Sequence, residues 1–476
     1  MMKFKKLFIS ALAASIAFTL ASCTEQKSEG AQAVIEKEED YLSHILVEDY
    51  EGYNFRILSR KGMSRDQYVE EETGDIINDA VFKRNEYVKS LFNIDITATE
   101  TTVGGYETEA LSSILAGDDQ YDMILPHSNA AFSYAIQHTL INYNDVETIH
   151  LDKPWWSQDI IESCNVNNHL YVLDGDIATH RLEYAMTMFF NKTIFDELGM
   201  GYPYEMVLDG EWTFDEFAKL VKKGSKDLNG DGVMTPENDR YGFYSSCWQS
   251  PITVLYAGGQ RIYNKDAKGV PQLTLNNSRT VDVFSKYFDL IDSDDVFVST
   301  SEVSNGYGGK YSGEHLFTSG RALFFDSTLG SARGMRSMTD DFGIVPFPKF
   351  EKEDDYATTI NGHASLVLMP ITVEDENRTG NIMEALCAVG SKEVIPAFYD
   401  VSLKTKFARD EESEQMIDIV KDSIVYDLGY VSGNTFQFVG RTLLYNGGDF
   451  SSHYAAHESA ALTKLKEFNK VYGNIG

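Results

Sequence analysis

Cysteine is scarce in this chain. Only four occur among 476 residues: Cys23, Cys164, Cys247 and Cys387. They lie far apart and no CxxC pair occurs, which excludes a disulfide framework and a cysteine-based metal site. A single disulfide among the last three stays open, because spacing alone cannot assign it.

Basic residues are also in short supply. The chain has 41 Lys and Arg against 73 Asp and Glu. Residues 1–22 hold three Lys and no acid, so the remaining chain has 38 basic and 73 acidic residues, a net charge of −35. So acidic a chain is not attracted to nucleic acid or to anionic lipid headgroups. We expect a neutral or cationic partner, or a metal ion.

Catalytic motifs are absent. There is no G-x-S-x-G elbow, H-E-x-x-H, Walker A loop or G-x-G-x-x-G, and the ten His show no metal-ligand spacing. Among 73 acids, a carboxylate pair suited to glycoside hydrolysis could always be assembled in space, but abundance is no evidence for one. We therefore predict no enzyme.

The apolar run at the N-terminus, Leu7–Leu20, is too short to cross about 30 Å of hydrocarbon. Lysines precede it and Leu20-Ala-Ser-Cys23 ends it, which is typical of a secretory signal peptide over residues 1–22. The ending resembles a bacterial lipobox, in which Cys23 is lipidated; the alternative is an ordinary signal peptide with a cysteine nearby. We expect an extracytoplasmic protein, anchored to the cell membrane by acyl chains through a flexible polar tether at residues 23–45.

Beyond the tether, short apolar strand patterns alternate with helix patterns, which predicts an α/β fold with parallel strands. Thr213 and Glu216 form a capping box at the start of one helix. The expected strands are residues 55–58, 94–98, 121–125, 170–173, 185–190, 322–325, 342–345 and 365–368. Expected helices include residues 79–93, 111–115, 191–199, 377–390, 393–400 and 454–471.

The sharpest local motif is the loop at residues 227–239. Oxygen-bearing side chains stand at positions 1, 3 and 5, and Gly232 stands at position 6, which is the ligand spacing of an EF-hand loop. Position 12 is Asn238 rather than a bidentate Glu, so the last ligand stays open, and a polar turn without metal is the alternative. The expected ligands of a structural Ca²⁺ are Asp227, Asn229, Asp231, the Val233 carbonyl and one of Glu237, Asn238 and Asp239.

Aromatic residues make up 12% of the chain, and flat rings can stack on the C–H faces of carbohydrates. Trp155 and Trp156 are expected in the core, and Trp212 is expected to pack beside the capping box. Trp248 lies in a polar stretch, where a ligand role and a structural role are both open.

The order of the motifs resembles the extracellular solute-binding lipoproteins of bacterial ABC importers, the carbohydrate-type family that includes maltose-binding protein. The resemblance covers roughly residues 50–400, and the C-terminal 70 residues match only as a helical tail. Its carriers are the lipobox, Tyr121-Asp-Met-Ile, Asn142-Tyr-Asn-Asp, Lys153-Pro-Trp-Trp, Phe189-Phe-Asn-Lys-Thr-Ile-Phe, Glu211-Trp-Thr-Phe-Asp-Glu-Phe, the Asp227 loop with Arg240-Tyr-Gly-Phe, Gly320-Arg-Ala-Leu-Phe and Phe342-Gly-Ile-Val-Pro-Phe-Pro.

The resemblance implies two interleaved α/β lobes, joined by hinge strands, with ligand held in the cleft between them. We place lobe 1 at residues 46–175 and 350–395, and lobe 2 at residues 176–346 and 396–476. By motif neighbourhood, the ligand-binding residues would be Arg60, Asn129, Asp176, Arg181, Glu183, Tyr244, Trp248, Asp326, Asn361 and His363.

The function implied is that of a monomeric, non-enzymatic binding protein, which delivers a sugar or oligosaccharide to ABC permease subunits. Two alternatives remain. One is a secreted carbohydrate-active enzyme, either a glycoside hydrolase or a lyase, and the other is an adhesion lipoprotein without a small ligand.

Overall fold

The computed structural model describes residues 41–101, 106–299, 312–407 and 410–473. The predicted signal peptide, Cys23 and most of the predicted tether lie outside these residues. The chain divides into two units, Met1–Val47 and Glu48–Gly476, and the second carries the fold described below.

The first sheet is parallel. Strand β1 (Tyr53–Ser59) lies between β2 (Ile94–Glu100) and β3 (Met123–Leu125), with Ile57 opposite both Ala98 and Met123. The strands expected at residues 55–58, 94–98 and 121–125 are therefore confirmed. Helix α2 (Ile76–Phe92) starts at the Asp75 cap and ends at Asn93, a left-handed residue with φ of 49°.

Two further strand predictions are only partly confirmed. Residues 170–173 and 365–368 form isolated antiparallel bridges, Leu173 with Val367 and Ile124 with Leu368, rather than full strands. They extend the first sheet beyond β3, because the Ile124 bridge joins β3 to the segment around Leu368.

The second sheet is mixed, in the order β10-β4-β9-β5-β8. Strands β5 (Tyr241–Ser246), β8 (Val296–Ser299) and β9 (Ala322–Thr328) are parallel, whereas β4 (Met186–Asn191) is antiparallel to β9 and to β10 (Phe342–Val345). The expectation of parallel strands is therefore confirmed for β5, β8 and β9 and wrong for the pairings of β4. Met186, at the start of β4, pairs with Thr328, at the end of β9, so these two strands run in opposite directions.

The aromatic surplus fills the core beside this sheet. Phe217 of α9 (Phe214–Gly224) meets Phe243 and Phe324 edge-on, with ring centroids 5.0 and 5.1 Å apart. Trp212 is fully buried and its indole N–H donates to the Pro346 carbonyl at 2.9 Å, which confirms its packing role. The backbone N–H of Glu216 donates to the Thr213 hydroxyl, which caps α9 as predicted.

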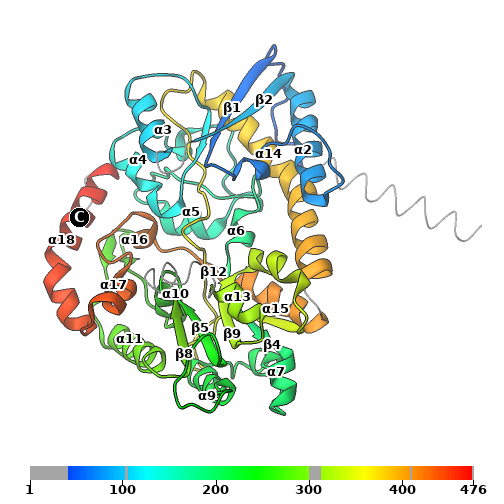
Figure 1. The fold of residues 1–476 in the computed structure, drawn as a ribbon. Coiled ribbons are helices and arrows are strands. Elements are labelled where there is room, and N and C mark those ends of the chain that lie inside the picture. The colour runs from blue at the N-terminus through cyan, green and yellow to red at the C-terminus, as the bar shows by residue number, and fades with distance from the viewer. Residues whose placement is uncertain (1–40, 102–105, 300–311, 408–409, 474–476) are drawn as a thin grey trace, which may run out of the picture. The chain divides into compact units, whose positions relative to one another are not determined.

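Helix α14 (Glu376–Pro396) packs beside α2 (Figure 1). The prediction of two separate helices, at residues 377–390 and 393–400, is wrong, because α14 continues through Gly390. A Cβ at this position would lie 2.1 Å from the Asp176 carbonyl, so the glycine serves close packing rather than helix termination. After Pro396 the chain continues as a π-helical segment, Ala397–Phe407.

Three chain segments meet between the two sheets. Ala185 pairs with Ile360, and the Asn361 N–H donates to the Tyr184 carbonyl at 2.9 Å. Strand β11 (Thr358–Thr359) pairs in parallel with β12 (Ile424–Val425). The predicted division into two lobes, with its boundaries and its hinge strands, stays a prediction.

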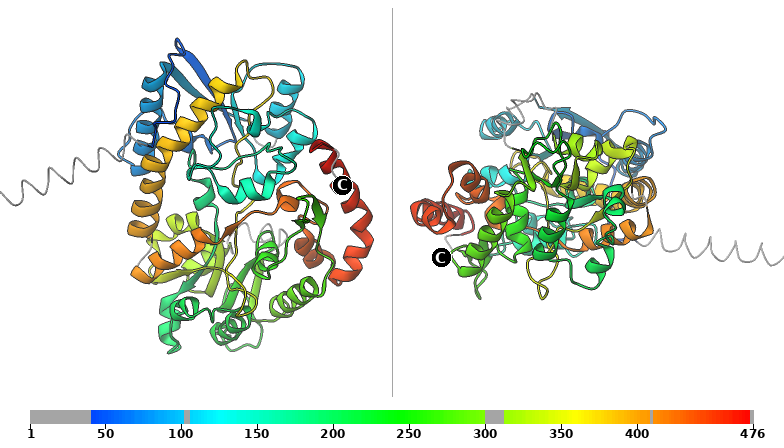
Figure 2. Two further views of the ribbon diagram at one scale, coloured as in Figure 1. Left: turned by 180° about the vertical axis from the view of Figure 1, so that it is seen from behind. Right: turned by 60° about the horizontal axis from the view of Figure 1, so that its bottom comes forward.

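The C-terminal helix α18 (Phe450–Val471) runs along one side of the second unit (Figures 1 and 2). Its Phe468 packs on Phe132 of α4 (Phe132–Ile136), with centroids 5.5 Å apart. Its Phe450 packs on Phe284 of α11 (Ser278–Ile291), with centroids 5.4 Å apart. The helix therefore contacts elements that flank both sheets, and it confirms the helical pattern expected at residues 454–471.

The remaining elements are α3 (Tyr106–Leu115), α5 (Gln158–Cys164), α6 (His180–Glu183), α7 (Lys192–Glu197), α8 (Tyr204–Leu208), α10 (Ser250–Ala257), β6 (Tyr263–Lys265), β7 (Pro271–Leu273), α13 (Gly313–Thr318), α15 (Glu411–Asp422), α16 (Leu428–Val431) and α17 (Val439–Asn446). Cys164, Cys247 and Cys387 are buried free thiols. Within the described ranges, every helix is too short or too polar to cross a membrane.

Candidate ligand-binding cavity

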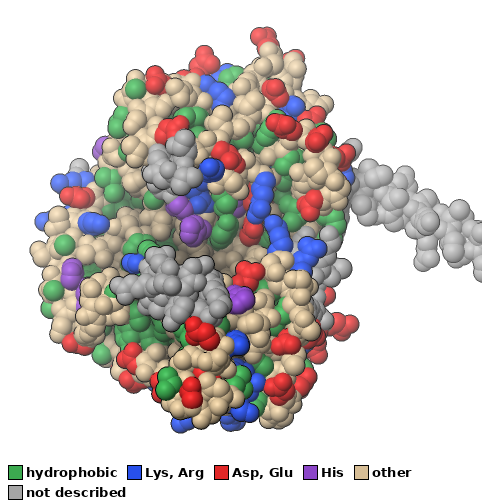
Figure 3. Space-filling view, viewed as in Figure 1, with side chains coloured by type: hydrophobic (Ala, Val, Ile, Leu, Met, Phe, Trp, Pro, Cys, Tyr) green, Lys and Arg blue, Asp and Glu red, His purple; other side chains and the backbone are tan. Residues whose placement is uncertain are grey.

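A cavity of about 380 Å³ opens where the carboxyl end of β5 faces the loop after β3. The face shown in Figure 3 is hollowed near its centre, where histidine side chains lie. Four separate stretches of chain supply the cavity walls. The lining residues are His127, Asn129, Ser246, Trp248, Gln249, Asn361, Gly362, His363 and Phe438.

No Asp, Glu, Lys or Arg is found among the described residues that line this cavity. The rings of His127 and His363 lie 5.2 Å apart. Burial, together with the nearby Arg60 charge and His363, lowers the pKa of His127 to about 3, and burial with Arg60 also lowers the pKa of His363. Both imidazoles are therefore neutral at neutral pH, and each offers one hydrogen-bond donor and one acceptor.

The other lining groups combine planar amides with aromatic rings. Asn129, Gln249 and Asn361 each offer a carbonyl acceptor and an NH₂ donor. The Trp248 side chain is 47% exposed, and the Phe438 ring stands perpendicular to it at 5.9 Å. This set of groups can hydrogen-bond a polar, uncharged molecule and stack on its apolar face.

The cavity floor depends on a glycine. A Cβ at Gly362 would lie 2.7 Å from Asn129 Nδ2 and 2.8 Å from the Tyr430 hydroxyl oxygen. Behind it, Arg60 donates to the His363 carbonyl and to the Ser365 hydroxyl, the latter at 3.1 Å from Nη2. Arg60 therefore fixes the backbone of the floor from behind the lining.

Asp326 holds the opposite wall. Its carboxylate accepts from the Ser246 backbone N–H at 3.2 Å and from the Ser250 hydroxyl, and burial raises its pKa to about 7. Tyr244 lies deeper on β5, where its ring packs against Phe297 and Phe325. Neither Asp326 nor Tyr244 is among the lining residues, so both act behind the wall.

Three predicted residues gather elsewhere. Asp176, Arg181 and Glu183 lie in or beside α6, in the segment that leads to β4. Arg181 is 3.8 Å from Asp176, and Glu183 accepts from Arg65 at 3.0 Å. The structure therefore brings Asn129, Trp248, Asn361 and His363 together in the cavity, whereas Asp176 lies beside Arg181 and Glu183 pairs with Arg65, outside the cavity lining.

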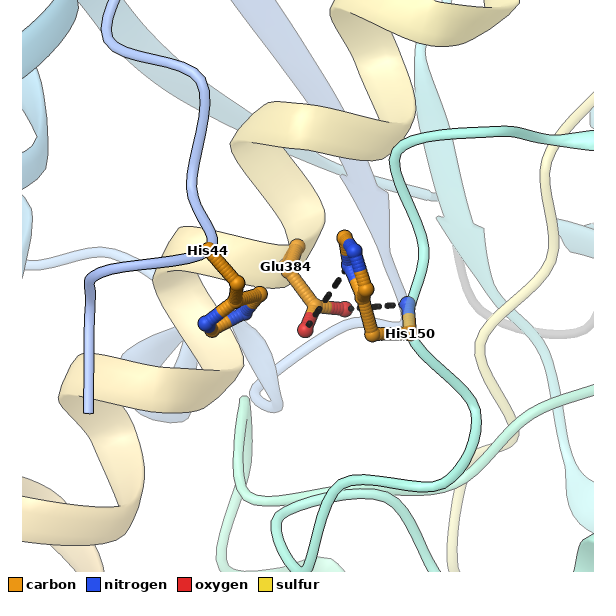
Figure 4. A group of neighbouring side chains, drawn as sticks. All are labelled: His44, His150 and Glu384. Carbon is orange, nitrogen blue, oxygen red and sulfur yellow. Dashed lines mark hydrogen bonds and ion pairs between the residues drawn. The ribbon is translucent and has the colours of Figure 1, made fainter. Parts of the chain in front are cut away.

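Glu384 occupies a buried polar site in the first-sheet region (Figure 4). It accepts from the indole N–H groups of Trp155 and Trp156, at 3.1 and 2.7 Å, and from the His150 backbone N–H at 3.1 Å. Both indoles are buried, which confirms their core role. The third residue drawn, His44, belongs to the unit Met1–Val47, and the two potential ligands left in the second unit are too few for a metal centre.

The loop at residues 227–239 connects α9 to β5, and backbone pairing of Lys226 with Arg240 closes it. The Asp227 carboxylate accepts from the backbone N–H groups of Gly230 and Gly232, at 2.6 and 2.8 Å. The Asp231 carboxylate accepts from the Val233 backbone N–H, and the Asp239 carboxylate accepts from the backbone N–H groups of Leu228 and Thr235. Gly232 has a φ of 80°, as the predicted sharp turn requires.

Solved structures share this architecture. An ABC substrate-binding protein from Listeria monocytogenes in complex with cycloalternan matches with a TM-score of 0.56 at 13% identity, over 89% of this chain and all of the other. The GacH receptor of Streptomyces glaucescens, solved unliganded and with acarbose, matches with 0.55 at 12% identity, over 89% and 100%. UgpB from Mycobacterium tuberculosis with glycerophosphocholine matches with 0.56 at 14% identity, over 87% and 98%.

The chain has the fold of ABC-transporter substrate-binding proteins. No protein-family model and no curated protein sequence matches it. Its substrate-binding-protein fold confirms the predicted α/β class, and the likeness rests on structure rather than on sequence.

Five residues that line the cavity are not among the predicted ligand-binding residues: His127, Ser246, Gln249, Gly362 and Phe438. The first four lie within two residues of a predicted one, and that proximity was the available signal. Phe438 comes from the C-terminal segment, which matched the substrate-binding proteins only as a helical tail, and no local motif marks it.

The raised pKa of Asp326 predicts a pH dependence of stability. Because its folded pKa lies above that of an unfolded Asp, its contribution to stability is complete below about pH 4 and is lost as the pH rises through about 7. We expect Asp326→Asn to flatten this part of the pH profile of the free energy of unfolding, measured by urea denaturation. The control is Asp289→Asn on the exposed face of α11; an equal flattening there would contradict the assignment.

Proposed function

We propose that this protein binds an uncharged sugar or oligosaccharide outside the cytoplasm and delivers it, as a monomer, to the permease of an ABC transporter. The observation that carries the proposal is the cavity itself. Its described lining combines a half-exposed indole, a second aromatic ring, planar amides and two neutral imidazoles, without a charged side chain. Hydroxyl groups need such donors and acceptors, and the C–H face of a sugar ring needs a flat apolar surface.

The fold supports a role in binding a solute, and the chemistry of the cavity lining is what distinguishes one class of ligand from another. The matched proteins from Listeria and Streptomyces are described with cycloalternan and acarbose, and the Mycobacterium protein with glycerophosphocholine. Glycerophosphocholine carries a phosphate and a quaternary ammonium group, and burying such charges without partners is costly. The uncharged lining therefore favours a sugar for this chain.

Binding and release follow from the position of the cavity. Asn361 and His363 come directly after the pairing of Ile360 with Ala185, while Ser246 and Trp248 come from the end of β5. A ligand that contacts both walls binds more tightly when they approach, so it shifts the population toward a closed state. The paired connecting segments are the natural hinge for this motion.

The enzyme alternative is less well supported. Glycoside hydrolysis needs two carboxyl groups beside the scissile bond. Among the described residues, the cavity lining offers none, and the carboxyl group of Asp326, behind the wall, is buried and hydrogen-bonded to Ser246 and Ser250.

The first test is a thermal shift of the mature protein against mono- and oligosaccharides, including cycloalternan and acarbose, with glycerophosphocholine as the charged comparison. A sugar at 100 times its dissociation constant should add about 2.7 kcal/mol to the free energy of unfolding. We expect Trp248→Ala to abolish or strongly reduce the shift without unfolding the free protein.

Tyr87→Ala is the matched control, because Tyr87 is similarly exposed, at 48%, on α2. A flat panel for the wild-type protein would contradict sugar binding. Chemical conversion of a sugar during the assay would favour the enzyme instead.

We further propose that the loop at residues 227–239 binds Ca²⁺ in a structural role. The support is the ligand spacing, together with a tight turn that gathers the side chains of Asp227, Asn229 and Asp231. The double variant Asp227→Ala/Asp231→Ala should lower the melting temperature in Ca²⁺ but not in chelator. An equal loss in both conditions would show that the acids act only through their backbone hydrogen bonds.

The lipid anchor is also a proposal, based on the sequence Leu20-Ala-Ser-Cys23. Cys23→Ala should leave an unlipidated protein that no longer fractionates with membranes, measured by fractionation and mass spectrometry of the N-terminus. Unchanged membrane association with an unmodified N-terminus would overturn the lipobox assignment.

A further inference from the structure

Trp248 differs from the other tryptophans in its exposure. Trp155, Trp156 and Trp212 are 4%, 1% and 0% exposed, whereas Trp248 is 47% exposed and lines the cavity. A half-exposed indole on a loop has freedom to rotate unless neighbouring groups hold it. The question is therefore which contacts fix its orientation.

Arg441 of α17 lies directly over this indole. Its guanidinium carbon is 3.5 Å from the centre of the Trp248 ring, a close cation–π stack. The same guanidinium lies over the Tyr445 ring, at 4.8 Å. Phe438, just before α17, meets the Trp248 ring edge-on at 5.9 Å and 89°. One short segment thus covers one face of the indole and supports its edge.

The guanidinium is held by rings rather than by charges. Within the described ranges, the buried Nε of Arg441 has no hydrogen-bond partner. Arg261, by contrast, stacks on Tyr256 at 4.7 Å but also donates to the Gln260 carbonyl at 2.8 Å. Among the described residues, the Trp248 and Tyr445 rings are therefore what holds the Arg441 head group, and Trp248 is the nearer of the two.

We propose that Arg441 is a positioning residue, which locks the Trp248 indole so that a single uncovered face is presented to the sugar. This inference rests on the proposed function for its effect on binding, but the locking itself does not. The C-terminal segment, which the sequence matched only as a helical tail, would then set the orientation of the stacking platform.

The expected effect on affinity follows from pre-organisation. An unlocked indole must be ordered when the ligand binds, and ordering one side chain typically weakens binding by about 3- to 10-fold. Arg and Lys differ in this role, because only the planar guanidinium stacks flat on a ring. Arg441→Lys should therefore restore only part of what Arg441→Ala loses.

The experiment measures acrylamide quenching of tryptophan fluorescence in the full mature protein. Quenching reports Trp248 selectively, because the other three indoles are buried. We expect steeper quenching in Arg441→Ala than in the wild type, with Arg441→Lys between them, because a second face of the ring becomes accessible. Arg261→Met is the control, since it removes a similar stack on Tyr256 rather than on Trp248, and its quenching should equal that of the wild type.

The same variants are then titrated with the saccharides of the thermal-shift panel. We expect the dissociation constant to rise for Arg441→Ala and to rise less for Arg441→Lys. Quenching equal to that of the wild type in Arg441→Ala, with an unchanged melting temperature, would overturn the proposal. Steeper quenching with no saccharide bound by any variant, the wild type included, would uphold the locking and refute the proposed function instead.

Discussion

The backbone pairing of Ala185 with Ile360 is the constraint on which the cavity depends. It places Asn361 next to Tyr184, and the chain then turns through Gly362 and His363 into the cavity floor. Arg60 clamps this turn from the first-sheet side, and Asp326 clamps the Ser246–Ser250 loop from the second-sheet side. Each wall is therefore fixed within its own sheet, while the paired segments between the sheets fix where the walls meet.

Charge is distributed unevenly in this acidic protein. The sequence carries 73 acids, yet the described cavity lining has none, and beside the connection to β4 Asp176 lies near Arg181 and Glu183 pairs with Arg65. An ionic cluster needs partners of opposite charge once it is buried, whereas a cavity for a neutral ligand needs groups that lose little on desolvation. The separation of these two regions is the physical basis for assigning the ligand as uncharged.

The sequence predicted local structure well and long-range assembly less well. The strands of the first sheet and the Thr213 cap follow from short patterns, and the packing of Trp212 follows from its place beside that cap. The direction of β4 depends on how the chain enters the second sheet, and the continuity of α14 through Gly390 depends on a contact with Asp176; neither is local.

In the site, motif neighbourhood identified Asn129, Trp248, Asn361 and His363. Asp326 and Tyr244, which the sequence also suggested, are not among the residues that line the cavity, because alternation along a strand does not reveal which side chains reach it. Phe438 and Arg441 could not be found, since no motif links the C-terminal segment to the β5 loop.

The central claim is that the cavity is built for an uncharged solute. The most direct test is calorimetric titration of the mature protein with the saccharide that gives the largest thermal shift, and with the same saccharide oxidised to its uronic acid. The two molecules differ only in one carboxylate, and an unpaired buried charge costs several kcal/mol. The account predicts that the neutral sugar binds and that the acid binds at least about 10-fold more weakly. Equal or tighter binding of the acid would contradict it and would point to an unrecognised cationic group in the cleft.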